Sequence, residues 1–226
     1  MNKRDKRVLA IGIIVLVAVI GLVVREVTLR RAVRTLPQIE VDLTDEKRAE
    51  LDAKIVASQA AIAADKSDFS AYTDLALAKT NLGYLNDAAE VYRHMNQLFP
   101  GNYLSFQNLG QLYEQEERFD LAAEQYLLAI DNAPRIPHLY RMYVNLITYK
   151  MPERHQEIPR VLTKGLEIVP EGVDFMSMMA VYYRDQGQLE DALHWFELLL
   201  VFDQENETAK REAMEIKEQL TGIKMQ

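Results

Sequence analysis

The 226-residue chain contains no cysteine, and this absence narrows what the protein can be. A lipoprotein anchor is excluded because it requires a lipidated cysteine. The four histidines form no i, i+4 pair and have no cysteine near them, so the sequence predicts no metal site. The absence of cysteine fits either side of a membrane.

Motifs of catalysis are also missing. The chain has no glycine-rich phosphate-binding loop, no G-x-S-x-G nucleophile motif and no H-E-x-x-H zinc motif. We therefore predict that the protein is not an enzyme and that it binds no cofactor.

Charge is distributed unevenly along the chain. Residues 1–34 hold eight lysines and arginines and two acidic residues, which gives a net charge of +6, whereas the whole chain carries −8. Residues 35–226 therefore carry −14. A domain this acidic would repel a phosphate backbone, so we exclude nucleic acid as a partner.

The chain does contain a repeat of 34 residues. Pro100 and Pro134 are separated by this distance, and each closes a segment with the same order of large, small and aromatic residues. A period of this length indicates stacked helical hairpins, each of which buries its apolar face against the next. Other pairs with this spacing are Leu75 and Leu109, Ala88 and Ala122, and Tyr92 and Tyr126.

Small residues recur where the two helices of each unit would meet. Gly110 and Ala122 let two helix axes approach closely, and Tyr126 fills the space beside them. The closing prolines cannot continue a helix and so set the next turn. This pattern resembles the tetratricopeptide repeat. The resemblance implies an all-α solenoid of helical hairpins, with repeats at 69–102, 103–136, 137–172 and 173–206.

The third repeat is two residues too long, because Pro134 and Pro170 are 36 residues apart. The packing pattern predicts that the extra residues lie in the turn between its two helices, within 150–157. This turn carries Arg154 and His155, so it is a candidate contact site. The alternative is a surface insertion without a function.

Further helices are expected at both ends of the repeats. Residues 44–64 place Leu51, Ile55 and Ile62 on one face, which predicts a long helix that packs on the first repeat. Residues 207–220 have an apolar face and a charged remainder, as a helix that caps a solenoid requires. The repeat domain thus covers 44–220, and residues 37–43 are expected to be a short linker.

The amino terminus, residues 1–36, is a different kind of sequence. Its segment 8–24, from Val8 to Val24, is 17 uncharged residues, and such a helix is about 25 Å long. Arg7 and Arg25 can extend to the two interfaces of a bilayer core of about 30 Å. No small-residue cleavage site follows, so a retained transmembrane helix is favoured over a cleaved signal peptide. A buried helix of a soluble protein is the weaker alternative.

Orientation in the membrane is a close choice. Four basic residues precede the apolar segment and four follow it, so the positive-inside rule gives a tie. The short, densely positive tail favours a cytoplasmic amino terminus, which places the repeats on the extracytoplasmic side. The basic stretch after the segment is expected to lie against anionic headgroups, or to be a plain polar linker.

The family resemblance also implies a binding surface. In such proteins, first-helix side chains that point away from the second helix line a concave groove where peptides bind. Amides there can hold the backbone of an extended peptide, and arginines can hold carboxylates. A solvated polar face without a ligand is the alternative. The candidate positions in this chain include Asn108, Gln111, Arg141, Asn145, Tyr149 and Arg184, with Ser177, Met178 and Val181 beside them.

One variant of the family binds the carboxylate tails of chaperones through a fixed set of lysines, asparagines and an arginine. Asn108 matches that set, but Thr73, Leu77, His138 and Met142 do not. A chaperone-tail adaptor is therefore not expected. Two functions stay open: a membrane-anchored adaptor that binds a partner segment, as in envelope assembly or secretion, or a scaffold whose repeats self-associate at the membrane without a peptide ligand.

Overall fold

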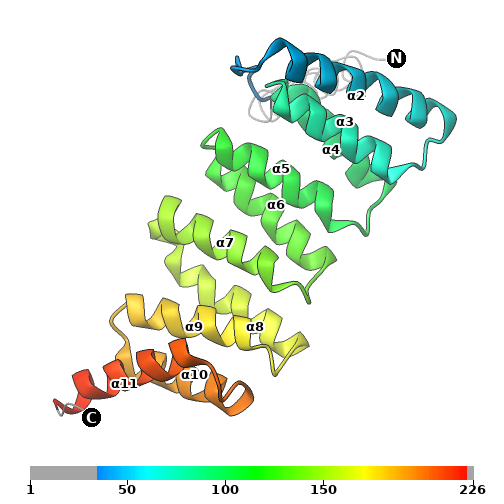
Figure 1. Ribbon diagram of the computed structural model, residues 1–226. Coiled ribbons are helices and arrows are strands. Elements are labelled where there is room, and N and C mark those ends of the chain that lie inside the picture. Colours follow the sequence, from blue (N-terminus) through cyan, green and yellow to red (C-terminus); the bar gives the residue numbers. More distant parts are fainter. Residues whose placement is uncertain (1–34, 223–226) are drawn as a thin grey trace, which may run out of the picture.

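The structure, a computed structural model, describes residues 35–222, and this part of the chain is built from helices (Figure 1). The all-α solenoid expected from the sequence is confirmed. In chain order the elements are α2 (Asp45–Ala64), α3 (Phe69–Asn81), α4 (Leu85–Leu98), α5 (Tyr103–Gln115), α6 (Phe119–Asn132), α7 (Pro137–Lys150), the 3-10 helix η1 (Pro152–Glu157), α8 (Ile158–Ile168), α9 (Val173–Asp185), α10 (Leu189–Phe202) and α11 (Glu207–Thr221).

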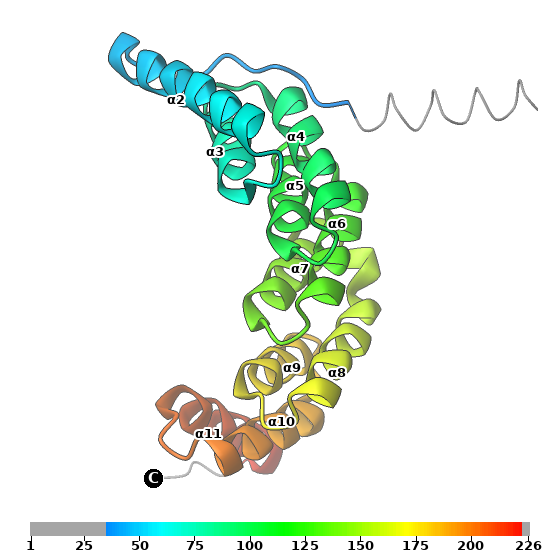
Figure 2. The same ribbon diagram turned by 90° about the vertical axis from the view of Figure 1, so that its right-hand side faces the viewer.

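The helices stack as hairpins into a curved array (Figure 2). The first helices of the hairpins, α3, α5, α7 and α9, lie on the inner side of the curve, and we call them A helices. The second helices, α4, α6, α8 and α10, lie on the outer side, and we call them B helices. At the ends of the array, α2 packs on α3 and α11 packs on α10.

The core lies between the two rows of helices and continues from one hairpin to the next. One cluster of buried side chains extends from Leu36 through the third repeat to Met179, and a second joins α9, α10 and α11. Phe175 of α9 is fully buried and meets the ring of Tyr140 of α7 edge to face, with centroids 4.8 Å apart. This contact joins the third repeat to the fourth.

The second repeat shows why its sequence forms a tight hairpin. A Cβ atom on Gly110 of α5 would lie only 2.5 Å from Cε1 of Tyr126 of α6, so only glycine fits against this ring. The Tyr126 hydroxyl also donates a hydrogen bond of 2.6 Å to Glu114 of α5. One aromatic side chain thus joins the two helices by its ring and by its hydroxyl.

The insertion in the third repeat is folded as η1, between α7 and α8. Arg154 of η1 donates hydrogen bonds of 2.7 and 2.9 Å to Glu157, and Tyr143 of α7 donates one of 2.7 Å to the same carboxylate. Arg154 also donates to Asp120 of α6 at 3.0 Å. These polar contacts tie η1 to the second repeat as well as to its own.

The A–B turns of the other three repeats share a residue with left-handed backbone. Gly83 has φ 81° and Gly187 has φ 71°, whereas the second repeat has Glu117 at φ 55°. Left-handed backbone costs a residue with a Cβ roughly 1–2 kcal/mol. Glu117 therefore occupies a position that suits glycine better.

Residues 35–43, which we call the N-terminal strap, are extended but lie against the first repeat. Leu36 is 3% exposed and its N–H donates to Asn86 Oδ1 at 3.3 Å, while the Ile39 N–H donates to the Gly83 carbonyl oxygen at 3.0 Å. Figure 2 shows the strap extending from α2 past α4. The segment 37–43, expected as a linker, is thus packed on the first hairpin: Ile39 is partly buried against the main core cluster, and Leu36 just before the segment is buried.

The predicted transmembrane helix, residues 8–24, lies outside the described residues. Across 35–222, none of the helices combines the length and the apolar composition needed to cross a membrane.

Candidate functional site

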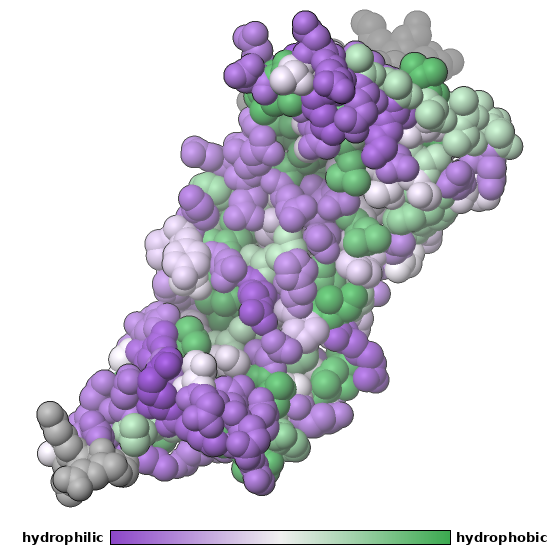
Figure 3. Space-filling view, viewed as in Figure 1, coloured by the Kyte–Doolittle hydropathy of each residue, from purple (hydrophilic) through white to green (hydrophobic). Residues whose placement is uncertain are grey.

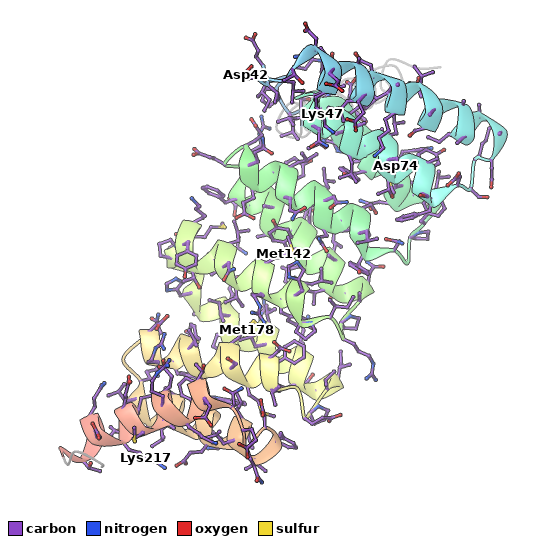
Figure 4. All side chains as sticks on the ribbon, in the orientation of Figure 1. Asp42, Lys47, Asp74, Met142, Met178 and Lys217 are labelled. Carbon is purple, nitrogen blue, oxygen red and sulfur yellow. The ribbon has the colours of Figure 1, made fainter. Side chains whose placement is uncertain are left out.

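A hollow with a volume of about 360 Å³ lies on the inner face, between the A helices α7 and α9. We call it the α7–α9 pocket. Val144 of α7 and Met178, Val181 and Tyr182 of α9 supply its apolar lining. Figure 4 shows Met178 on α9 on the same face as Met142 on α7. Polar side chains surround this lining: Arg141, Asn145, Thr148, Asp174, Ser177, Asp185 and Gln186.

Three predicted binding residues come together in this pocket. Arg141, Asn145 and Tyr149 follow one another at intervals of four residues along α7, so they share one face of the helix. The Tyr149 side chain is 76% exposed, which is unusual for a large aromatic residue. The predictions from the sequence thus converge at one place on α7.

Asn108 and Gln111 lie elsewhere on the inner face. They line a smaller hollow of about 170 Å³ between α3 and α5, together with Leu77 and Thr80. Burial raises the pKa of Tyr92, in the same hollow, to about 12, and hydrogen bonds to Thr80 and Asn108 oppose the rise. Asn108 therefore also bonds the buried Tyr92 within the chain.

Arg184 lines neither hollow. Its guanidinium lies 2.6 Å from Glu212 Oε2 of α11 and 2.9 Å from Asp185 Oδ1. The contact with Arg184 lowers the pKa of the Glu212 carboxyl, with desolvation as an opposing effect. Arg184 thus joins the fourth A helix to the capping helix α11.

Arg141 also has an acidic partner within the chain. Its Nη2 atom donates a hydrogen bond of 2.8 Å to Asp174 Oδ1 of α9, and both side chains are about half exposed (54% and 48%). The pair lies at the rim of the α7–α9 pocket. In the structure, Arg141 therefore has a carboxylate partner on the next A helix, and its binding to a partner protein stays a prediction.

The third-repeat insertion contributes to the same pocket. His155 of η1 has Nε2 at 3.2 Å from the Thr148 carbonyl oxygen and Nδ1 at 3.5 Å from Gln186 Nε2. It closes the pocket at the edge where α7 and α9 end. The two-residue excess of the third repeat had indicated this turn as a candidate contact site. The contact between His155 and Gln186, 31 residues away, could not be predicted from the sequence.

The inner face is mixed in character. Figure 3 shows hydrophobic patches scattered among hydrophilic side chains on this side of the array. Among residues 35–222, no group of histidine and acidic side chains is arranged to hold a metal ion.

Residues 104–136, which are α5, α6 and the turns beside them, match the family model of the tetratricopeptide repeat. No curated protein matches the chain in sequence.

Solved structures of two proteins resemble the array. YrrB, described as a TPR protein with an unusual peptide-binding site, is 18% identical, with 73% of this chain and 84% of YrrB covered and a TM-score of 0.50. MamA is 19% identical, with 74% of this chain and 97% of MamA covered and a TM-score of 0.51. At such identities the likeness shows the fold alone. Neither the repeat model nor these structures indicates a catalytic family.

Proposed function

We propose that this protein is a membrane-anchored adaptor whose inner face binds an extended segment of a partner protein. The observation that carries this proposal is the α7–α9 pocket, where an apolar lining lies among amide, hydroxyl and charged side chains. Pockets of this kind, with a few polar groups around an apolar interior, are typical ligand sites. The peptide-binding site described for YrrB, which has a similar fold, is consistent with this function.

The chemistry of the inner face suits an extended backbone. A peptide in this conformation presents N–H donors and carbonyl acceptors in alternation, and an amide side chain can satisfy both. Asn145 is exposed at the pocket, and Gln111 lies along the face on α5. The exposed ring of Tyr149 supplies a large apolar surface that a bound segment would cover.

A capture experiment tests this function: the full-length chain is used to isolate its partner from detergent-solubilised membranes. The double variant Asn145→Ala/Tyr149→Ala removes an exposed amide and an exposed aromatic ring from the pocket. We expect it to lose a partner that the wild type retains. The matched control, Gln97→Ala/Leu98→Ala, removes an exposed amide and an exposed apolar side chain from the B helix α4 and should retain the partner.

Two outcomes would contradict the proposal. If the pocket variant captures the partner as well as the control does, the inner face is not the binding site. If the captured protein is a second copy of this chain, and the mass of the purified protein rises with its concentration, the self-associating scaffold is the better description.

The anchor in this proposal is the segment 8–24, and the repeats lie on the extracytoplasmic side, a setting that suits envelope assembly or secretion. We expect the mature protein to begin at or near Met1 and to resist extraction with alkaline carbonate. A soluble product that begins near residue 25 would contradict the anchor. Protease added outside intact spheroplasts should digest the repeats, and full protection would reverse the orientation.

A further inference from the structure

The charged groups at the α7–α9 pocket are already paired within the chain. Arg141 bonds Asp174 at 2.8 Å, and Asp185 lies 2.9 Å from Arg184, which also reaches Glu212 at 2.6 Å. A partner with a carboxylate or an ammonium group would meet charges that are already balanced by a neighbour of opposite sign. This balance reduces the electrostatic gain that a charged partner could obtain.

The interior of the pocket is lined by apolar side chains. Val144 and Met178 are partly buried and pack against the main core cluster, so they form a fixed floor. Val181, 36% exposed, stands beside them on α9. An apolar side chain placed there would lose its contact with water and cover these three residues, which is favourable by the hydrophobic effect.

The third-repeat insertion bounds this surface on one side. His155 spans from the Thr148 carbonyl oxygen to Gln186, and Arg154 holds η1 in place through Glu157 and Asp120. This side of the pocket is therefore attached to the helices around it, and α7, α9 and η1 bound the pocket. An open hollow of about 360 Å³ has room for a side chain and its neighbouring backbone.

We propose that the α7–α9 pocket selects an uncharged partner segment and holds one bulky apolar side chain of it against Val144, Met178 and Val181. This inference rests on the proposed function and specifies the partner's chemistry. Asn145, Ser177 and Gln186 lie around the apolar surface, where they can bond the backbone on either side of the anchored side chain.

The test uses the full-length chain in lipid nanodiscs and fluorescein-labelled decapeptides of serine, asparagine and glutamine. The peptides are identical except for one central residue, which is Leu, Phe, Asp or Lys. Empty nanodiscs measure any partition of the peptides into lipid. We expect the Leu and Phe peptides to bind at least about tenfold more tightly than the Asp and Lys peptides, with little change between 50 and 500 mM salt (roughly a threefold change in Debye length).

A pair of matched variants assigns the binding to the pocket. Val181→Asp places a carboxylate in the apolar lining and should weaken the Leu peptide by about tenfold or more. Val56→Asp makes the same change at a valine of α2 that is 65% exposed and should leave binding unchanged. Melting curves of both variants show whether each is folded.

The other outcomes separate the inference from the function on which it rests. The Asp or Lys peptide could instead bind best, with an affinity that falls as salt rises and is reduced by Asn145→Ala. The pocket would then bind peptides through their charge, and the inference would be wrong. If no peptide binds, or if Val181→Asp and Asn145→Ala bind every peptide as the wild type does, both the inference and the proposed function of this face are wrong.

Discussion

The second and third repeats close their hairpins in two different ways. In the second, α5 and α6 meet directly along their length, because Gly110 lets the Tyr126 ring lie against the helix backbone. In the third, η1 contacts both α7 and α8, and these two helices meet each other over a smaller part of their length. Arg154 and Glu157 hold this wedge in place. The third repeat therefore adds a folded insertion, held by hydrogen bonds and ion pairs, to the apolar core that its two helices share.

This difference changes what each repeat responds to. The close contact of Gly110 with the Tyr126 ring in the second repeat depends on shape, so it is sensitive to added volume. The ion-pair network in the third repeat depends on the charge of Glu157, so it responds to acid. Neighbouring repeats of one solenoid should consequently be destabilised by different changes.

The largest effect is expected from Gly110→Leu in the second repeat. The Cβ atom alone would lie 2.5 Å from the buried Tyr126 ring, so the added side chain must force α5 and α6 apart. We expect a loss of about 3 kcal/mol in the free energy of unfolding, seen as a lower and broader thermal transition by circular dichroism. Gly101→Leu is the control, because a Cβ there meets no atom within 4 Å. Equal melting of the two variants would mean that the assigned contact is wrong.

A smaller effect is expected from Glu157→Gln in the third repeat. The change removes the charge that Arg154 and Tyr143 bond, which costs about 2 kcal/mol at pH 7. Glu153→Gln, an exposed acidic residue of the same η1, is the matched control and should cost little. Urea unfolding of the three proteins at pH 7 measures the difference.

The same pair of variants gives a pH prediction with a definite sign. Hydrogen bonds from Arg154, opposed by desolvation, lower the pKa of Glu157 from 4.5 to about 2 in the folded protein. Its stabilisation is therefore fully present above pH 4.5 and is lost as the pH falls from 4.5 towards 2. The gap in unfolding free energy between wild type and Glu157→Gln should narrow over this range. A gap that stays constant from pH 6 to pH 2.5 would exclude the network as its cause.

The smallest effect is expected at the turn of the second repeat. Glu117→Gly relieves a left-handed residue, at the position that Gly83 and Gly187 occupy in the first and fourth repeats. We expect a gain of about 0.5–1 kcal/mol in stability, measured by urea unfolding. Glu116→Gly, which makes the same change one residue earlier, should destabilise the protein or leave it unchanged. A Glu117→Gly variant less stable than the wild type would count against strain at this turn.

The parts of the fold that repeat could be predicted from the sequence. The 34-residue period, Gly110 with Tyr126, and the two-residue excess in the third repeat each reflect a local rule that recurs along the chain. The contacts that could not be predicted join residues about one repeat apart, such as Arg141 with Asp174 and Arg154 with Asp120. An acidic chain offers several partners at that distance, and only side-chain geometry selects among them.

The place of the candidate residues could be predicted from the sequence, but their contacts within the chain could not. The helical spacing brought Arg141, Asn145 and Tyr149 to one face of α7. The ion pair between Arg141 and Asp174 on the next A helix had no sequence signal. The packing of the strap had no sequence signal either: Leu36 and Ile39 are too few to show a period, and their contacts depend on a surface formed by the first hairpin.

Attachment of the strap to the first repeat fixes the length of the tether to the proposed anchor. Leu36 follows Val24 by twelve residues, and a fully extended chain covers at most about 3.6 Å per residue. The first repeat can therefore lie no farther than about 43 Å from the end of the segment 8–24. A partner captured on the inner face would be kept near the bilayer, where its effective concentration for other membrane-bound components is raised without any additional contact.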